Sequence, residues 1–339
     1  MATVPASVAR PGSDAGAMRI DILSEAKRQG HALTVCSIVH DELYVLPEFF
    51  RHYRALGVDR FLVLDDASTD GSREFLAAQP DCTVFTSDVR YFDIVNGRRA
   101  LHAWRQELLD RYCVGQWALF PDADEFLVLP PGRGIRDVIA TLEREGSRSI
   151  WGLMLDMYPE TLAGMRPDGG PFRLDGGWCY DGGLHLIYRK GWNKPMTIYR
   201  GSRARLMAEN GILERDLGWF KRQAIALGFG GYLKHNMIFK VPLMFWQEGD
   251  VVEGSHQIAP RPTTSRILAI LHFKFTPDTA RKIDYALSTG GYYEGSRQYV
   301  ALATLMERLA AKGGSFMGRR SKRFTDSGDP YRTGAGRWS

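Results

Sequence analysis

Three carboxylates lie within four residues near the middle of the chain, as Asp122, Asp124 and Glu125. Apolar runs of strand length flank them at 117–120 and 126–129, so the acids interrupt a predicted buried strand. Buried uncompensated carboxylates are costly, which predicts that these side chains face solvent, a cation or a substrate. In an extended chain Asp122 and Asp124 share one face and Glu125 points the other way. Two oxygen donors on one face suit a hard divalent cation that also binds phosphate.

Other buried strands also end in polar side chains. The β-branched run 33–39 precedes His40 and Glu42, and the run 60–64 precedes Asp65 and Asp66. Helical periodicity separates the runs, which predicts an α/β fold with a mostly parallel, doubly wound sheet and helices on both faces. Ligands bind at the carboxyl ends of such strands, so the acids are expected at one shared edge. A polar turn between two strands remains the alternative for Asp122-Ala-Asp-Glu125.

A helix expected to begin near Asn96 carries Arg98 and Arg99 at its start. The backbone N–H groups at a helix N-terminus and the guanidinium groups of arginine both bind phosphate. These two arginines are therefore predicted to assist in binding a phosphorylated ligand.

The composition is that of an ordinary globular protein. The 339 residues, 44% of them hydrophobic, suffice for one large domain or two. The four cysteines, Cys36, Cys82, Cys113 and Cys179, show no metal-type spacing, which predicts reduced, buried thiols. No apolar run has the length of a membrane span and no signal peptide is evident, so a cytoplasmic location is expected.

The net charge of +5 includes one dense basic cluster, Gly318-Arg-Arg-Ser-Lys-Arg323. A solvated tail is favoured over a nucleic-acid patch for this cluster, so no nucleic-acid partner is expected. The same tail allows peripheral contact with anionic lipid at the inner face of the membrane. The oligomeric state is not indicated.

In their order along the chain, several short motifs resemble those of family-2-like glycosyltransferases of the GT-A fold. The motifs are His40-Asp-Glu-Leu43, Leu46-Pro-Glu-Phe49, His52-x-x-x-Leu-Gly-Val58, Asp65-Asp-Ala-Ser-Thr-Asp70, Trp117 with Asp122-Ala-Asp-Glu-Phe126, Lys240-Val-Pro-Leu243, Gly254-Ser-His256, Leu271-His-Phe-Lys-Phe275 and Gly291-Tyr-Tyr293. They extend over about residues 32 to 305. Each motif alone is weak, whereas the ordered set is specific.

The resemblance implies a metal-dependent enzyme that moves a sugar from a nucleotide-sugar donor to a hydroxyl of a glycan, lipid or other acceptor, inverting by direct displacement. It implies that Asp66 contacts the base or ribose, that Asp122 contacts the ribose or a metal-bound water, and that Asp124 holds Mn²⁺ or Mg²⁺. A late histidine, His272, would complete the metal site. The donor-binding residues expected on this basis are His40, Glu42, Asp65, Asp66, Arg98, Arg99 and Asp122, with Asp122, Asp124 and His272 at the metal.

Asp156 follows the predicted strand 149–155 and is the first candidate for the general base that deprotonates the acceptor. A strand-terminating turn before Pro159 is the alternative interpretation of this residue. Asp181 and Glu253 are the further candidates.

The chain is expected to divide into four parts. These are a disordered segment at 1–30, a nucleotide-sugar-binding half at 31–150, an acceptor-binding half with the C-terminal helices at 151–312, and a disordered basic tail at 313–339. Residues 200–231 match the family pattern poorly and are interpreted as an insertion that sets the acceptor.

Three other functions are alternatives to the transferase. A nucleotidyltransferase would need a glycine-rich triphosphate loop where His40-Asp-Glu42 stands. A phosphatase with Asp122 as nucleophile would need Thr or Val in place of Glu125 and a downstream lysine motif. A non-catalytic carbohydrate-binding protein with a degenerate transferase fold stays open, and it would bind sugar without nucleotide or metal.

Overall fold

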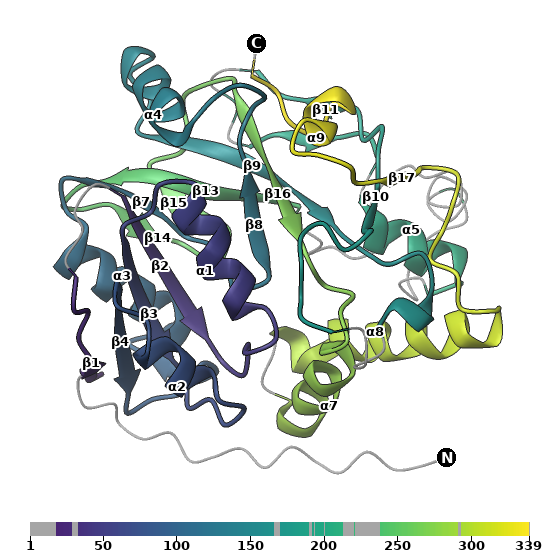
Figure 1. Cartoon of the computed structure of the whole chain (residues 1–339), viewed down its shortest axis with the longest axis horizontal. Coiled ribbons are helices and arrows are strands. Elements are labelled where there is room, and N and C mark those ends of the chain that lie inside the picture. Colours follow the sequence, from purple (N-terminus) through teal and green to yellow (C-terminus); the bar gives the residue numbers. More distant parts are fainter. Residues whose placement is uncertain are drawn as a thin grey trace.

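The computed structural model describes residues 18–28, 33–165, 170–189, 192, 194–199, 201–212, 220, 238–290 and 293–338. These residues form a nine-stranded central sheet with helices on both faces (Figure 1). In spatial order its strands are β1 (Ile20–Ser24), β4 (Cys82–Ser87), β3 (Arg60–Asp65), β2 (Thr34–Val39), β7 (Gln116–Leu119), β13 (Phe239–Trp246), β9 (Ser149–Asp156), β16 (Ile267–His272) and β8 (Glu125–Val128).

Smaller two-stranded sheets lie around the central sheet. They pair β5 (Ile94–Val95) with β6 (Arg98–Arg99), β10 (Cys179–Asp181) with β17 (Ser321–Arg323), β11 (Leu186–Ile187) with β12 (Met196–Thr197), and β14 (Val251–Val252) with β15 (Ile258–Ala259). The helices are α1 (Leu46–Ala55), α2 (Ser72–Ala77), α3 (Ala100–Tyr112), α4 (Ile135–Arg144), α5 (Ser202–Glu209), α7 (Thr279–Thr289), α8 (Tyr293–Ala311) and α9 (Asp329–Arg332), with a 3₁₀ turn at Leu162–Met165. Within the part of the chain that is described, no helix combines the length and apolarity needed to cross a bilayer.

Six of the nine strands run in the same direction, which confirms the mostly parallel sheet. β2, β3, β4 and β7 form one parallel block, and β9 and β16 form another. β13 lies between the blocks and is antiparallel to both neighbours, and β1 and β8 are antiparallel edge strands. The carboxyl ends of the six strands therefore share one edge of the sheet with the amino ends of β13 and β8.

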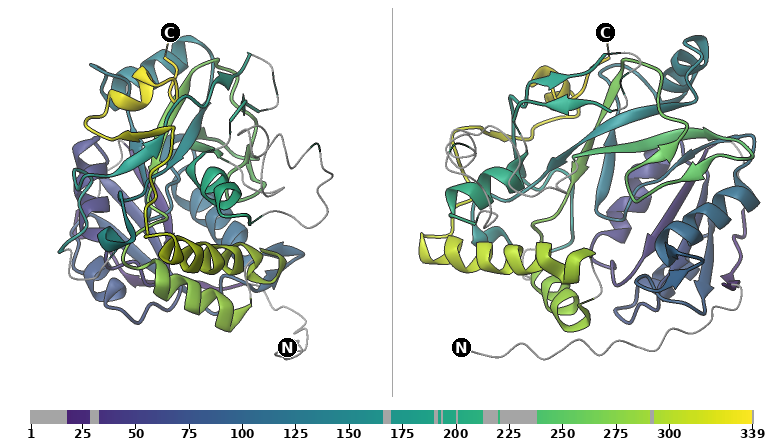
Figure 2. Two further views of the ribbon diagram at one scale, coloured as in Figure 1. Left: turned by 90° about the vertical axis from the view of Figure 1, so that its right-hand side faces the viewer. Right: turned by 180° about the vertical axis from the view of Figure 1, so that it is seen from behind.

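Alternating side chains of the inner strands bury both faces of the sheet, as continuous apolar runs predict. Val35 and Val39 of β2 pack in the cluster that contains α1, whereas Cys36 packs in the cluster that contains α3. Helix α1 lies on the near face in Figure 1 and α3 on the opposite face, seen in the right-hand view of Figure 2. Gly57 ends the α1 segment with φ +99°, a conformation that only glycine adopts without strain.

The strict strand–helix alternation is confirmed for the first half of the chain only. β2, β3 and β4 extend in one direction and β7 adds on the other side of β2, so the order reverses between β2 and β7. In open α/β sheets such a reversal is where ligands bind. Beyond it the predicted pattern fails, because antiparallel β13 enters the sheet and β8 lies at the far edge.

Residues 20–24, expected within a disordered segment, form β1 instead. Ile20 pairs with Ser87 of β4, so this strand covers an otherwise open sheet edge. The rest of the expected segment at 1–17, and residues 29 and 30, lie outside the described residues.

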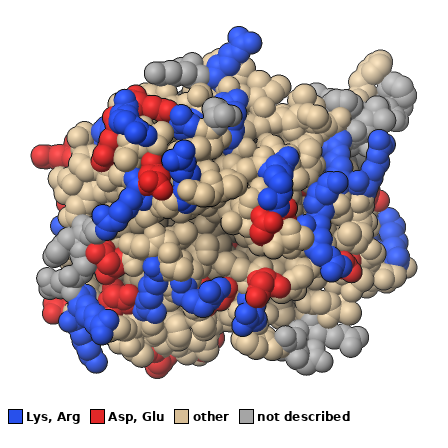
Figure 3. Space-filling view, turned by 45° about the horizontal axis from the view of Figure 1, so that its top comes forward, with Lys and Arg blue, Asp and Glu red and all other residues tan. Residues whose placement is uncertain are grey.

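The expected disorder of 313–339 is also wrong for the described residues of that segment. β17 pairs with β10, and Arg337 forms a bridge with Ile267. Phe316 is fully buried against Tyr158 and Phe275. The disorder was predicted from the average composition of the segment, which is rich in glycine, serine and arginine, and that average does not show one buried phenylalanine. The basic side chains remain outside, and Lys and Arg gather on the right of the face in Figure 3, the side where β17 and the end of α8 lie.

The four cysteines are free and buried, as predicted. Burial raises the pKa of the Cys36 thiol to about 12, with the neighbouring Cys113 thiol adding to the effect. A thiol with so high a pKa stays protonated and is a poor nucleophile or metal ligand.

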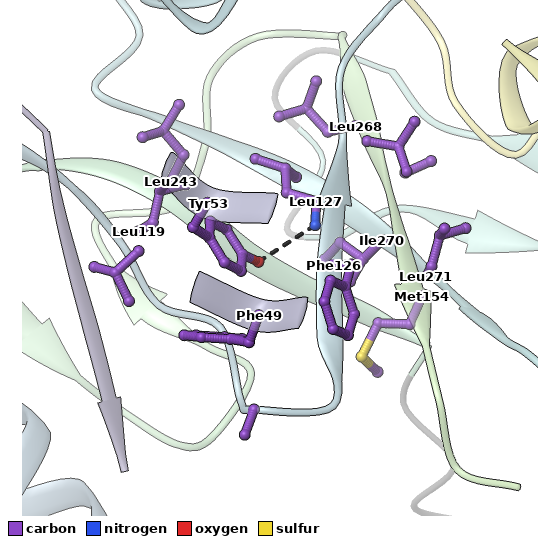
Figure 4. Packing of buried hydrophobic residues seen from close by; sticks show 14 of the residues in the cluster. Phe49, Tyr53, Leu119, Phe126, Leu127, Met154, Leu243, Leu268, Ile270 and Leu271 are labelled. Carbon is purple, nitrogen blue, oxygen red and sulfur yellow. Dashed lines mark hydrogen bonds between the residues drawn. The ribbon is translucent and has the colours of Figure 1, made fainter. Parts of the chain in front are cut away.

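Tyr53 of α1 anchors the start of β8 to the helix layer. Its hydroxyl donates to the Glu125 carbonyl (3.0 Å) and accepts from the Leu127 N–H (3.3 Å), the bond drawn in Figure 4. Phe126 packs edge-on against Phe49 of the same helix, with ring centroids 6.3 Å apart. The core thus fixes the backbone that carries the acidic stretch.

Candidate functional site

Acidic and imidazole side chains from four strands meet at the shared edge of the sheet. Asp66 follows β3, Asp122 and Asp124 follow β7, Asp156 ends β9 and His272 ends β16. His272 and Asp156 are direct neighbours in the parallel β9–β16 register. This is the edge at which the sequence predicted a ligand site.

The acidic stretch is a turn, not one continuous strand. β7 ends at Leu119 and β8 begins at Glu125, and the Glu125 N–H donates to the Asp122 carbonyl (3.0 Å). The alternative interpretation of Asp122-Ala-Asp-Glu125 as a polar turn between two strands is therefore confirmed for the backbone. Asp122 and Asp124 nevertheless line the same two cavities.

Two buried cations hold the turn. Lys240 Nζ, on a side chain only 1% exposed, lies 3.1 Å from Asp122 Oδ2 and 2.6 Å from Glu125 Oε2. Arg105, also buried, donates from Nη2 to Asp122 Oδ1 (3.0 Å). Burial opposes ionisation of Asp122, but Lys240 and Arg105 outweigh it and hold the pKa of this carboxyl well below its usual range. Burial and the Asp122 charge raise the pKa of Glu125 despite Lys240.

Asp124 lies between a lysine and a histidine. Its Oδ2 is 3.5 Å from Lys274 Nζ and 3.7 Å from His272 Nε2. Burial opposes its charge, but Lys274 and His272 prevail and lower the pKa of Asp124 to about 2. Asp124 is therefore ionised at neutral pH and faces a ring nitrogen.

The expected metal ligand set is only partly assembled. Within the described ranges, no group of three or more His, Cys, Asp or Glu side chains is arranged to hold a metal ion. Asp122 is already paired with two cations, so the structure does not favour it as a direct ligand. Asp124 and His272 do fit, because Asp156 accepts from His272 Nδ1 (2.7 Å) and the Nε2 lone pair then faces the Asp124 carboxylate. A proton or a cation between these two atoms, which are 3.7 Å apart, would satisfy both of them.

Two adjoining cavities open at this edge. The smaller, about 150 Å³, is lined by residues that include His40, Glu42 and Asp66. The larger, about 770 Å³, is lined by residues that include Arg203 and Glu253. The side chains common to both walls are Tyr91, Leu101, Asp122, Asp124, Ser255, Lys274 and Tyr299.

The smaller cavity contains two buried polar atoms without a hydrogen-bond partner, His40 Nε2 and Asp66 Oδ1. His40 Nδ1 donates to the Asp66 carbonyl (2.6 Å), so in the neutral ring Nε2 is an acceptor. Burial raises the pKa of Asp66, so its carboxylate is protonated more easily than that of an exposed aspartate. Buried polar atoms without a hydrogen bond are unusual. The nearest charged atoms are Asp41 Oδ2, 3.8 Å from His40 Nε2, and Arg90 Nη1, 3.7 Å from Asp66 Oδ1. His40 and Asp66 both line the cavity.

Helix α7 closes one side of the smaller cavity. Lys282 Nζ lies 2.7 Å from Glu42 Oε2, and the Tyr285 ring lies against His40 with centroids 4.5 Å apart. Arg281 binds Asp41 at 3.2 Å. The polar residues after β2 are therefore positioned by a helix from much later in the chain.

Asp65, expected among the donor-binding residues, lies outside both cavities. It is fully buried and paired with Arg73, whose Nη2 is 2.7 Å away. As the last residue of β3, its side chain points away from the edge opening, whereas Asp66 points into it. Asp65 is therefore a structural partner of α2.

Arg98 and Arg99 line the larger cavity, but they form β6 before α3 begins. Arg98 donates to the Val252 carbonyl of β14. Both arginines therefore border the larger cavity, although the helix starts two residues later than Arg98; their binding of a phosphorylated ligand stays a prediction.

The three candidate bases have different environments. Asp156 is buried, and Arg203 (2.9 Å) and His272 (2.7 Å) bind its two carboxylate oxygens. Burial opposes its charge, but Arg203 and His272 dominate and hold the pKa of Asp156 well below its usual range, which suits a base poorly. Asp181 binds Tyr158 and Arg205 and lines neither cavity. Glu253, with a side chain 41% exposed, lies on the wall of the larger cavity and pairs with Arg261.

Sequence reasoning missed the cations of the site, chiefly Arg105, Lys240 and Lys274. Lys240 stands in an apolar strand, Phe239–Trp246, where a charged residue signals a buried partner. That signal was present in the sequence. The identity of the partner was not, because it depends on β13 entering the sheet beside β7.

Comparison with known proteins gives a distant relative and weakly similar solved structures. No protein-family model matches the chain. Over 121 residues the chain is 27% identical to a glycosyltransferase family 92 protein of Oryza sativa subsp. japonica, a match that covers 33% of this chain and 19% of the rice protein. The chain thus spans about a fifth of that relative. Membership in family 2 is not confirmed, since that relative belongs to family 92.

Among solved structures, the chain is similar to TarS of S. aureus, with 13% sequence identity and a TM-score of 0.29. The match covers 82% of this chain and 43% of TarS. At this TM-score the similarity has no bearing on fold or function.

Proposed function

We propose that the chain is a glycosyltransferase that moves a sugar from a nucleotide-sugar donor to an acceptor hydroxyl. The observation that carries this proposal is the pair Asp124 and His272, which face each other at 3.7 Å where the two cavities adjoin. Lys274 stands beside this pair at 3.5 Å from Asp124. Such a site is suited to a diphosphate, with the nucleoside on one side and the acceptor on the other. The relative from family 92 supports the same class of reaction.

The smaller cavity would bind the nucleoside. His40 Nε2 and Asp66 Oδ1 form no hydrogen bond there, and the nearest charges, Asp41 Oδ2 at 3.8 Å and Arg90 Nη1 at 3.7 Å, leave room for one, so a base or ribose could satisfy both atoms. Discrimination by such groups is strong, because a ligand without matching donors leaves them buried and unpaired.

Asp124 and His272 would hold a divalent cation, and the imidazole ligand favours Mn²⁺ over Mg²⁺. When bound, the cation would supply positive charge to the leaving diphosphate. Lys274 lies next to Asp124 and lines both cavities, so its ammonium group would add to that stabilisation.

Glu253 is the general base in this proposal, because it alone among Asp156, Asp181 and Glu253 lines a cavity. The acceptor oxygen would bond to the anomeric carbon as the bond from that carbon to the diphosphate oxygen breaks. The hydroxyl proton would pass to Glu253 and the bonding electrons to the diphosphate. Direct displacement of this kind inverts the anomeric centre.

Replacing Glu253 with Gln is expected to lower kcat about 100-fold or more, because general-base catalysis contributes roughly 10²–10⁴-fold. Nucleotide affinity should stay unchanged, since Glu253 lies on the larger cavity and not on the smaller. Glu248→Gln, at an exposed position outside both cavities, is the matched control. Unchanged kcat in Glu253→Gln would remove this residue from the mechanism.

The proposed function is tested by donor consumption. UDP-, GDP-, CMP- and dTDP-sugars are incubated with the protein, Mn²⁺ and mixed glycan and lipid-linked acceptors, and release of free nucleotide is measured. We expect one donor class to be consumed in a Mn²⁺-dependent reaction. A protein that binds sugar but consumes none of these donors would instead be a carbohydrate-binding protein.

A further inference from the structure

The His272 imidazole lies between two carboxylates that come from different strands. Its Nδ1 is 2.7 Å from Asp156 Oδ1, a hydrogen-bond distance, whereas its Nε2 is 3.7 Å from Asp124 Oδ2. A carboxylate that bonds Nδ1 keeps the proton on that nitrogen and directs the lone pair of Nε2 the other way. The ring is thus aimed at Asp124.

Asp156 is itself held on every side. Arg203 Nε donates to Oδ2 (2.9 Å), and the Asp156 side chain is only 2% exposed. Ser202 Oγ donates to its carbonyl (2.8 Å), and the Met157 N–H donates to the His272 carbonyl (2.8 Å). Each carboxylate oxygen therefore already has a partner, Oδ1 with His272 and Oδ2 with Arg203, on a side chain that is closed to solvent.

We propose that Asp156 is a positioning residue that fixes the tautomer and orientation of His272 so that Nε2 binds a divalent cation together with Asp124. This inference rests on the proposed function and gives Asp156 a role other than general base. Second partners of metal-binding histidines typically change metal affinity 10- to 100-fold when they are replaced. Arg203 of α5 also lines the larger cavity. The Arg203–Asp156 contact therefore links that cavity, where the acceptor would bind, to the proposed cation site.

The test compares Mn²⁺ affinity of wild type, Asp156→Asn and Asp181→Asn, measured by the EPR signal of free Mn²⁺ with and without UDP. Asp181→Asn is a matched control, because Asp181 is also 2% exposed and pairs with an arginine, Arg205, at 2.6 Å. Asp181 lines neither cavity. Thermal unfolding of both variants shows whether their stability losses are comparable.

We expect Asp156→Asn to bind Mn²⁺ 10- to 100-fold more weakly and Asp181→Asn to bind it like wild type. Equal affinity of Asp156→Asn and wild type would overturn the inference while leaving the proposed function in place. Equal weakening in both variants would assign Asp156 a general structural role and would also overturn it. If wild type itself binds no Mn²⁺, the proposed metal site and the inference fail together, whereas a lack of turnover with intact Mn²⁺ binding counts against the transferase alone.

Discussion

Asp124→Asn is expected to lower metal-dependent sugar transfer about a thousandfold. The substitution removes the carboxylate that faces His272 Nε2 and would hold the cation. Stabilisation of the leaving group's charge by a cation lowers the activation free energy by several kcal/mol. Each 1.36 kcal/mol changes the rate about tenfold. Initial rates at saturating donor and Mn²⁺ measure the effect. Activity within a few-fold of wild type would contradict the assignment of Asp124.

A stability measurement separates this effect from misfolding. The pKa of Asp124 is about 2, below its usual 3.8, so the ionised group stabilises the fold above about pH 4 and this contribution is lost as the pH falls toward 2. Asp124→Asn should therefore be less stable than wild type at pH 7, and the difference should shrink in acid. A folded variant at pH 7 that lacks activity is the expected result.

Lys240→Met is expected to destabilise the fold by about 3–5 kcal/mol, the usual cost of removing one partner from a buried ion pair. Glu125, whose side chain is 3% exposed, would lose its partner at 2.6 Å. Asp122 would keep Arg105 at 3.0 Å, so Glu125 carries most of the cost. Urea denaturation at pH 7 measures the change in the free energy of unfolding.

The pH dependence and a double variant check the cause. The pKa of Glu125 is already raised by burial, and loss of Lys240 would raise it further, so protonation at low pH should relieve the penalty. A group whose pKa is raised in the folded state stabilises the fold below its unfolded pKa, and this contribution is lost as the pH rises. Lys240→Met combined with Glu125→Gln should recover part of the loss at pH 7; no recovery would show that the Lys240–Glu125 pair is not the cause.

The sequence was sufficient to predict the first half of the sheet and the edge at which the site lies. The runs that became β2 and β3 are short, continuous and apolar, and each ends in polar residues that the structure places beside one opening. The placement of Asp122 and Asp124 on the walls of the cavities at that edge followed from the same pattern, although the backbone there is a turn.

Long-range pairing could not be predicted. Nothing local indicates that β13 lies antiparallel beside β7, and only that pairing brings Lys240 to Asp122 and Glu125. For a similar reason the sequence did not show that the Asp156 carboxylate is already bonded, since its partners Arg203 and His272 lie far along the chain. The glycine and arginine content of the C-terminal segment predicted disorder, because composition does not show the apolar contacts that order it.

The most direct measurement is nucleotide binding by thermal shift, with UDP, GDP, CMP and dTDP, each with and without Mn²⁺, on wild type and Asp124→Asn. We predict that one nucleotide stabilises the wild type in the presence of Mn²⁺ and that Asp124→Asn loses the metal-dependent part. A ligand at about 100 times its Kd adds roughly 2.7 kcal/mol, a shift that is readily detected. No stabilisation by any nucleotide at millimolar concentration would contradict a donor site at this edge of the sheet.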